Sequence, residues 1–389
     1  MSSTATVPAT QRAQVLKAFN EPYTFTATHP TPPAPKDYEL LVQVKAASYC
    51  HTDAVFASGA MQQVLPRIGS HEFCGVIHSF GPKAQEAAAA LGLKEGMIVG
   101  CPGRALNPCG ECQECASGEA AGDYPGYGVW CTKAGNLGLT SDGGWQEWAI
   151  VDSRQVAPVP EGLAAVEVAP LMCAGVTIWS AIEKAGVDMA DKMKNKNKRV
   201  AVLGAGGGLG HLGVQFASLL GVEVLAVDVG DALKMTEEVK KETEALGGGK
   251  VHVVDARHDP TEVKSRIFGE VAPGLEGERG CDASIVLPEA QAAFDFGMAI
   301  LKNHSKCVVV SFPKDGWKFQ PRDTVFRHID VVGVLVGRNK QLRAMLKFAA
   351  EQGVRAKIRT YALENLNGLV EDYHKGAGGK LVVDLEKAA

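Results

Sequence analysis

The run Val200-Ala201-Val202-Leu203-Gly204-Ala205-Gly206-Gly207-Gly208-Leu209-Gly210 decides the fold of this chain. Its first four residues predict a short buried strand, and its glycines predict a tight turn. An apolar helix is expected over residues 211–220, followed by a second strand over residues 222–228. Glycines let backbone amides approach a pyrophosphate at the start of the helix, where the helix dipole favours an anion. The run therefore predicts a β-α-β unit that binds a dinucleotide.

The glycine turn and the acid that ends the second strand carry the cofactor prediction. The pattern G-x-G-x-x-G is not matched, because position 209 is Leu; the match is G-x-x-G-G-x-G, a longer turn. Asp228 can accept both ribose hydroxyls and would repel a 2′-phosphate, so NAD is predicted over NADP. The alternative is a glycine turn that binds nothing, which the strand–turn–helix–strand–acid order disfavours. The residues expected to contact the cofactor here are Gly204, Gly207, Gly208, Leu209 and Asp228.

Further strands alternate with helices after this unit. This alternation implies a parallel doubly wound sheet, so the predicted fold class is α/β. The additional strands are expected over residues 250–255, 283–287, 307–312 and 331–337.

Composition sets the bounds of the protein's class. Its 389 residues are too many for one hydrophobic core, so two domains are expected. A net charge of −4 and the lack of any run near eighteen apolar residues predict no nucleic-acid partner and no membrane span. Residues 1–10 lack the apolar core of a signal peptide. Ten cysteines in a chain that is not secreted indicate metal ligands or free thiols rather than disulfides, and the expected compartment is the cytoplasm.

Four cysteines form the clearest metal motif. Three of them follow C-x2-C-x2-C spacing, and the fourth comes after fifteen further residues. Four thiolates make a closed tetrahedral zinc site, with Zn–S bonds of about 2.3 Å. Such an ion would stabilise a loop and would have no open position for a substrate. The alternative is four unrelated buried thiols, which this spacing in a loop rich in Gly and Glu disfavours. The predicted structural zinc ligands are Cys109, Cys112, Cys115 and Cys131.

A second set of candidate ligands is spread along the chain. The stretch Cys50-His51-Thr52-Asp53 follows an apolar run, and the pair His71-Glu72 follows a glycine turn. Cys173 lies in an apolar stretch that is expected to be helical. Each has an ordinary alternative: a buried thiol beside a surface imidazole, a satisfied histidine in a turn, and a small core residue. Only their combination indicates a metal site.

Together these motifs resemble the zinc-dependent medium-chain alcohol dehydrogenase family, closest to its yeast-like branch. The resemblance covers residues 16–384. It implies a Rossmann NAD-binding domain over residues 171–337, and a GroES-like, mostly-β catalytic domain made of residues 1–170 together with 338–389. The motifs that carry it are residues 50–53, Gly69-Ser70-His71-Glu72, the four cysteines, Leu171-Met172-Cys173-Ala174-Gly175 and Gly207-Gly208-Leu209-Gly210.

The resemblance also implies two zinc ions per chain, one structural and one catalytic. Cys50, His71 and Cys173 would hold the catalytic ion and leave one position open, with Glu72 as an alternative ligand. Asp53 would accept a hydrogen bond from His71.

The roles of the remaining site residues are likewise implied by the resemblance. Thr52 would hydrogen-bond the substrate oxygen and take the alcohol proton. His51 and Lys380 would contact the cofactor phosphates, and Lys234 would help Asp228 at the adenosine ribose. The cofactor contacts implied outside the glycine turn are His51, Thr52, Lys234, Phe312, Val336 and Lys380.

Three positions depart from the family pattern. Val55 stands where the family has a histidine that passes the proton to solvent. Proton release would then use the cofactor ribose and water, with Ser58 as a further candidate. Met61 and Ala105 stand where the small-alcohol branch has two tryptophans, so a pocket lined by Thr52, Met61 and Ala105 is expected to take substrates larger than ethanol.

The predicted function is therefore zinc-dependent hydride transfer between NAD(H) and an alcohol/aldehyde or ketone pair. One alternative is an NADPH-dependent aldehyde reductase of the cinnamyl alcohol dehydrogenase type, against which Asp228 speaks. Another is a non-enzymatic, crystallin-like protein that binds zinc and nucleotide, against which the intact Cys50, His71 and Cys173 speak. Residues 331–337 resemble a strand that pairs between subunits in this family, so a homodimer or homotetramer is expected.

Overall fold

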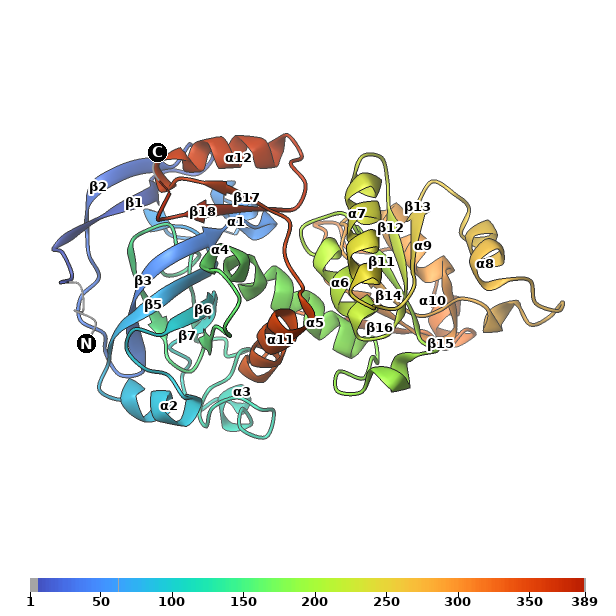
Figure 1. The fold of residues 1–389 in the computed structure, drawn as a ribbon, viewed down its shortest axis with the longest axis horizontal. Helices are drawn as coiled ribbons and strands as arrows, with labels where there is room; N and C mark the ends of the chain where they lie inside the picture. Colours follow the sequence, from blue (N-terminus) through green and yellow to red (C-terminus); the bar gives the residue numbers. More distant parts are fainter. Residues whose placement is uncertain (1–5, 62, 388–389) are drawn as a thin grey trace. The chain divides into compact units, whose positions relative to one another are not determined.

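The glycine turn of residues 204–210 joins a strand to a helix in the computed structural model, which describes residues 6–61 and 63–387 (Figure 1). Strand β11 (Arg199–Leu203) precedes the turn, and helix α6 (Gly210–Leu219) and strand β12 (Glu223–Asp228) follow it. The predicted β-α-β unit is confirmed. The other elements that complete this sheet and its helices are α5 (Ala174–Lys184), α7 (Ala232–Ala245), β13 (Val251–Asp255), α8 (Pro260–Phe268), β14 (Cys281–Val286), α9 (Gln291–Ala299), β15 (Leu301–Val309), α10 (Pro321–Val325) and β16 (Asp330–Gly333).

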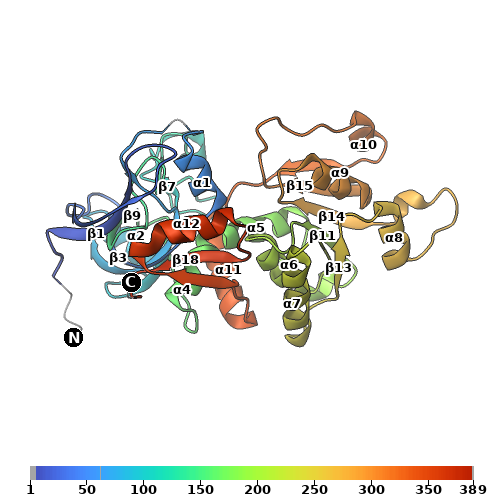
Figure 2. The same cartoon turned by 90° about the horizontal axis from the view of Figure 1, so that it is seen from above.

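The six strands form one parallel sheet in the order β13-β12-β11-β14-β15-β16. Figure 2 shows α7 and α9 on opposite faces of this sheet. The order is that of doubly wound dinucleotide-binding sheets, in which ligands bind beyond the carboxyl ends of the strands where the winding reverses. Here that point lies between β11 and β14, next to the glycine turn. The predicted doubly wound α/β sheet is confirmed.

Two strand boundaries differ from those expected from the sequence. Strand β15 begins at Leu301, whereas the sequence predicted a start at Cys307. Most of the residues before Cys307 are polar, so the apolar pattern did not reveal this part of the strand. Strand β16 ends at Gly333 instead of Gly337. Val336 has φ +45°, in the left-handed region that a β-branched residue rarely adopts, and an extended strand cannot pass through it.

The rest of the chain forms a mostly-β unit. Its strands and helices are β1 (Thr10–Leu16), β2 (Thr24–Pro30), β3 (Glu39–Ser48), α1 (His51–Ala57), β4 (Arg67–Ile68), β5 (Glu72–Phe80), α2 (Ala84–Leu91), β6 (Ile98–Pro102), β7 (Arg104–Leu106), α3 (Gln113–Ala116), β8 (Gly135–Asn136), β9 (Trp148–Asp152), β10 (Ala157–Pro158), α4 (Ala165–Val168), α11 (Asn339–Gln352), β17 (Ile358–Tyr361), α12 (Leu366–His374) and β18 (Lys380–Asp384).

Strand β3 is the centre of this unit. It pairs with β5 on one side, with β18 on the other, and also with β9. Through β18 the C-terminal part of the chain returns to the strand that leads into Cys50, with Val382 opposite Ser48. Residues far apart in the sequence thereby meet beside α1.

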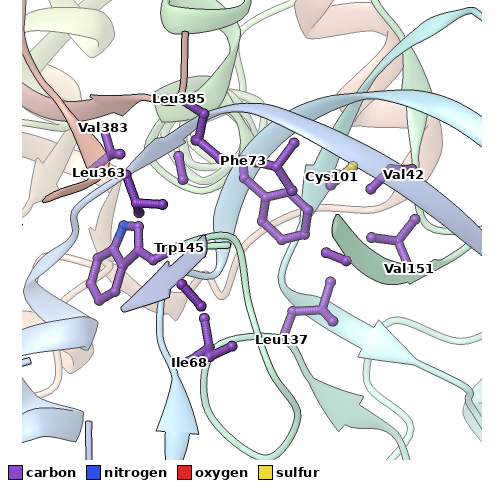
Figure 3. Packing of buried hydrophobic residues seen from close by; sticks show 14 of the residues in the cluster. Val42, Ile68, Phe73, Cys101, Leu137, Trp145, Val151, Leu363, Val383 and Leu385 are labelled. Carbon is purple, nitrogen blue, oxygen red and sulfur yellow. The ribbon is translucent and has the colours of Figure 1, made fainter. Parts of the chain in front are cut away.

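A hydrophobic core holds this arrangement together (Figure 3). Phe73 on β5 and Trp145 are fully buried, and Trp145 stacks on Tyr49 with ring centroids 5.7 Å apart. Burying a large aromatic side chain contributes about 3 kcal/mol. The core therefore fixes the residue that immediately precedes Cys50.

Contacts divide the chain into two compact units. The first comprises the described residues up to Ala174, Arg338–Ala350 and those from Ala356 onward; the second comprises Gly175–Gly337 and Glu351–Arg355. The end of α11 thus belongs to the second unit. Gln215 explains this placement, because its side chain exchanges hydrogen bonds of 2.9 and 3.0 Å with the backbone of Arg355.

Among the described residues, no single helix has the length and apolarity to cross a membrane. One bent pair, Ala165–Met172 with Ala174–Lys184, meets that test only when its two parts are taken together.

We expect Phe73→Ala to lower the free energy of unfolding by about 3–5 kcal/mol, because it leaves a cavity in the core of the first unit. The measurement is urea unfolding of the zinc-loaded protein followed by tryptophan fluorescence. The matched control is Phe25→Ala on β2, where the side chain is 39% exposed. A cost for Phe73→Ala no larger than that of the control would contradict the account of the core.

Candidate active site

Asp53 is the residue on which the predicted metal site is built. Cys50 is the N-cap of α1, and Asp53 in the first turn accepts a 2.9 Å hydrogen bond from the Cys50 amide through Oδ2. Its Oδ1 accepts a 3.2 Å hydrogen bond from the Ser70 amide and lies 3.2 Å from His71 Nδ1. Asp53 is only 1% exposed. One buried carboxylate therefore ties the start of α1 to the loop that carries His71.

That loop is held in an unusual backbone conformation. Ser70 has φ +70°, and its hydroxyl donates a 3.0 Å hydrogen bond to the carbonyl of Ser48 on β3. Two glycines pack directly against it: a Cβ at Gly143 would lie 1.9 Å from Ser70 O, and one at Gly103 would lie 2.4 Å from His71 Cβ. Only glycine fits at positions 103 and 143, so the backbone of these two residues packs closely against the loop and fixes the position of His71.

The three predicted catalytic ligands meet in the first unit. The ligand atoms of Cys50, His71 and Cys173 all lie within 4.8 Å of one another. With Asp53 accepting at Nδ1, His71 presents Nε2, which is buried and has no hydrogen-bond partner among the described residues. Two thiols and an imidazole whose lone pair is unsatisfied are the donors that zinc prefers, and three protein ligands leave a position open. The residues therefore fit a catalytic zinc ion.

The protonation equilibria of these groups express the same fit. A hydrogen bond with Cys173 lowers the pKa of Cys50 well below its usual range, and that bond together with burial raises the pKa of Cys173. Burial would lower the pKa of His71, but Asp53 and Cys50 more than offset it, so the pKa of His71 is raised. The hydrogen bond between the two thiols keeps the proton on Cys173 and favours the thiolate of Cys50, whereas the negative charge of Asp53 and Cys50 raises the pKa of His71. A divalent cation can take the place of the protons on Cys173 and His71.

Glu72 and Lys380 form a buried ion pair beside this site. Lys380 Nζ donates to Glu72 Oε1 and, at 2.9 Å, to the carbonyl of Tyr49. Burial raises the pKa of Glu72 to about 7, against the opposing effect of Lys380. Lys380 is 4% exposed, and a contact to cofactor phosphates, as expected from the resemblance, would use the N–H that is not donated to Glu72 or Tyr49.

The four cysteines of the structural motif also converge. The Cys112 and Cys115 sulfurs are 3.5 Å apart, and those of Cys131 and Cys109 are 3.7 Å apart. Sulfurs around a tetrahedral zinc with bonds of about 2.3 Å are separated by about 3.8 Å. Backbone amides of Glu111 and Cys112 lower the pKa of Cys109 to about 6, which favours its thiolate. The set fits a closed zinc site, and the long spacing before Cys131 does not prevent it.

The lobe between Cys115 and Cys131 is anchored at its middle and its end. Asp123 is buried and accepts hydrogen bonds from the Arg338 side chain and the Asn339 amide. The Arg338 guanidinium also lies over the Trp130 ring, 4.6 Å from its centroid. These contacts let residues 116–130 loop out while Cys131 returns to the other three cysteines.

In the second unit, Asp228 lies against the glycine turn. Asp228 accepts hydrogen bonds from the Gly206 amide at 2.7 Å and the Val229 amide at 2.8 Å. A Cβ at Gly210 would lie 1.9 Å from Gly204 O, so this turn requires glycine at 210. Lys234, which the resemblance places at the adenosine ribose, pairs with Asp231 at 2.7 Å.

The other predicted site residues are placed as follows. Thr52 Oγ1 lies 3.9 Å from Cys50 Sγ, and exposed His51 shares a hydrogen bond with Tyr373. Met61 and Val55 are half-buried. Ala105 is buried and has φ +70°. Phe312 is 66% exposed, and Val336 is half-buried.

Comparison with known proteins agrees with this geometry. Residues 36–161 match the family model described as an alcohol dehydrogenase GroES-like domain, and residues 208–351 match the zinc-binding dehydrogenase model. An alcohol dehydrogenase from Geobacillus stearothermophilus is 31% identical over 90% of this chain and 92% of that protein. The chain belongs to the zinc-dependent medium-chain alcohol dehydrogenase family. It is an oxidoreductase with a GroES-like domain and a Rossmann domain.

Other relatives of this alcohol dehydrogenase cover nearly its full length. Alcohol dehydrogenase 1 from Neurospora crassa is 30% identical over 98% of this chain and 99% of its own. The crystal structure of the alcohol dehydrogenase from Aeropyrum pernix superimposes with a TM-score of 0.75 at 26% identity, covering 96% of this chain and 99% of that one.

The sequence did not reveal the residues that hold the metal-ligand residues in position. Ser70 contributes an amide and a hydroxyl, and Gly103 and Gly143 contribute close packing. None of them carries a chemical signature of its own. The only signal was the glycine-rich setting of His71, which does not reveal which glycine touches it.

We expect two zinc ions per chain by mass spectrometry of the purified alcohol dehydrogenase. Cys50→Ser should lose the catalytic ion, and Cys112→Ser should lose the structural ion. Each variant should then retain about one zinc ion per chain. Cys281→Ser, at a buried cysteine outside both clusters, is the matched control and should retain both ions. Two ions in Cys50→Ser would contradict the ligand assignment.

Proposed function

We propose that this alcohol dehydrogenase transfers a hydride between NAD(H) and an alcohol or its aldehyde or ketone, with substrates larger than ethanol. The observation that carries the proposal is the convergence of Cys50, His71 and Cys173 around the unsatisfied Nε2 of His71. Such a set has one position left for a substrate oxygen.

The residues of the site have distinct tasks in this proposal. A bound zinc ion would supply Lewis acidity to the substrate oxygen, and bound NAD would accept or deliver the hydride. Cys50, His71 and Cys173 hold the metal, and Asp53 keeps the His71 ring in the tautomer that can bind it. Glu72 is the nearby carboxylate available as an alternative ligand.

Proton transfer in this proposal begins at Thr52. Its hydroxyl lies 3.9 Å from Cys50 Sγ, beside the metal ligands, where it can hydrogen-bond the substrate oxygen and take the alcohol proton. Val55 offers no group to pass that proton on, and Ser58 Oγ donates to the Val55 carbonyl at 2.8 Å. With a cofactor bound, its ribose and water would supply the outward path.

The choice of NAD over NADP rests on Asp228. Backbone amides of Gly206 and Val229 hold both oxygens of its carboxylate at the end of β12. A fixed negative charge there suits ribose hydroxyls and repels a 2′-phosphate. His51, Lys234, Phe312, Val336 and Lys380 complete the proposed cofactor contacts.

The substrate pocket and the assembly complete the proposal. Met61 and Ala105, at positions where the small-alcohol branch has tryptophans, leave room for a larger substrate. The exposed apolar side chains of Val331 on edge strand β16 and of nearby Leu335 favour a homodimer or homotetramer. The fungal relative at 30% identity favours the yeast-like branch, and we propose a cytoplasmic location.

We expect kcat/KM to be at least about tenfold higher with NADH than with NADPH, because the 2′-phosphate would meet the Asp228 carboxylate. Asp228→Ala should reduce that ratio about tenfold or more. The matched control is Asp295→Asn, an exposed carboxylate on α9 bonded to Gln291, which should leave the ratio unchanged. A wild-type preference for NADPH would contradict the assignment.

We expect kcat/KM for benzyl or long-chain alcohols to exceed that for ethanol. Met61→Trp should shift the preference toward ethanol by about tenfold, because it restores bulk in the pocket. The measurement is initial rates at 340 nm over a panel of alcohols and aldehydes. Faster turnover of ethanol by the wild type would remove the basis for a wide pocket.

We expect Val55→His to change the pH dependence of alcohol oxidation. A histidine near its usual pKa can accept the proton that otherwise leaves through water, so the rate should rise at lower pH in the variant. Val55→Gln is the control, since it adds polar bulk but does not titrate. Identical pH–rate profiles for wild type and Val55→His would show that position 55 lies outside the proton path.

A further inference from the structure

The imidazole of His51 is held by a hydroxyl from the other end of the chain. His51 is the first residue of α1, and Tyr373 lies near the end of α12. The Tyr373 hydroxyl oxygen is 2.9 Å from His51 Nδ1. The contact arises because β18, which follows α12, pairs with the end of β3 just before α1. Both residues lie in the first unit.

The Tyr373 ring is itself fixed. It lies 4.9 Å from the Tyr49 ring, and Tyr49 stacks on the fully buried Trp145. Tyr373 is half-buried and packs against the same core. A hydroxyl on a ring that packs against this core is a positioned hydrogen-bonding group, so it restricts the orientation of the His51 side chain.

The chemistry of the pair suits an anionic ligand at His51. A neutral imidazole has one donor and one acceptor nitrogen, while a tyrosine hydroxyl can donate or accept. When the Tyr373 hydroxyl donates to Nδ1, the imidazole proton resides on Nε2, which can then donate to a phosphate oxygen. A partner that only accepts would force the proton onto Nδ1 and leave Nε2 unable to donate.

The geometry points to Tyr373 as a positioning residue for cofactor binding: its hydroxyl holds the His51 ring in the orientation and tautomer in which Nε2 donates to the cofactor pyrophosphate. The inference rests on the proposed function, which gives His51 the phosphate contact. Tyr373 acts only through His51 and does not touch the reacting atoms.

The test compares dissociation constants of NADH and NADPH for the zinc-loaded full-length protein and its variants. Tyr373→Phe keeps the ring and removes the hydroxyl, and it should weaken both dinucleotides about two- to tenfold, the range for loss of one hydrogen bond. The KM for cofactor should rise likewise, while kcat at saturating cofactor stays within about twofold. The matched control is Tyr361→Phe, which removes a hydroxyl bonded to Asp372 of the same helix at 2.7 Å and should leave cofactor binding unchanged.

A double-mutant cycle with His51→Gln separates positioning from general packing. If Tyr373 acts through His51, Tyr373→Phe should have no further effect on the dissociation constants in the His51→Gln background. The 15N shifts of the His51 ring in histidine-labelled protein should also change in Tyr373→Phe and not in Tyr361→Phe. Without the Tyr373 hydroxyl, no donor at Nδ1 fixes the imidazole proton on Nε2. Equal weakening by Tyr373→Phe with and without His51, or unchanged dissociation constants in Tyr373→Phe, would overturn the inference.

The two proposals fail in different ways. Both dinucleotides carry the pyrophosphate, so a wild-type protein that binds NADPH and not NADH contradicts the cofactor choice alone, and Tyr373→Phe is then tested with NADPH. Tight NADH binding that is unchanged in Tyr373→Phe contradicts the role of Tyr373 alone.

Discussion

The carboxylate of Asp53 is the constraint on which the site depends. It accepts hydrogen bonds from the Cys50 and Ser70 amides and faces His71 Nδ1, so one buried group sets the first ligand, the loop of the second ligand and the tautomer of its ring. A buried carboxylate is costly unless its oxygens are satisfied. Here the groups that satisfy it are those that the metal site needs in place.

The two candidate zinc sites differ in how they are built. The four cysteines lie within a short segment, and their sulfurs surround one point, which leaves no position for a substrate. Cys50, His71 and Cys173 come instead from three separate segments. The core around Trp145 and the pairing of β3 with β5 hold the segments of Cys50 and His71, and Ala169, in the segment before Cys173, packs with Ala46 of β3. The second site therefore depends on the whole first unit, and it keeps the open position that chemistry requires.

Much of this could be predicted from the sequence, because the deciding features are local. The parallel sheet is predicted by the order of strand, glycine turn, helix and second strand ending in Asp228. The structural metal site is predicted by the spacing of the four cysteines. The catalytic ligands could be paired only through resemblance to a family, since Cys50 and Cys173 are far apart in the chain. The supporting contacts lay outside sequence reasoning: a positive φ at Ser70, a close approach of Gly143, and the Glu72–Lys380 pair all depend on tertiary packing.

The most direct test of the central claim is zinc K-edge X-ray absorption on Cys112→Ser protein that retains one zinc ion. The account predicts two sulfur ligands at about 2.3 Å and the remainder nitrogen or oxygen at about 2.0–2.2 Å, as expected for Cys50, Cys173, His71 and one exchangeable ligand. A shell of four sulfurs, or one with no sulfur, would contradict it.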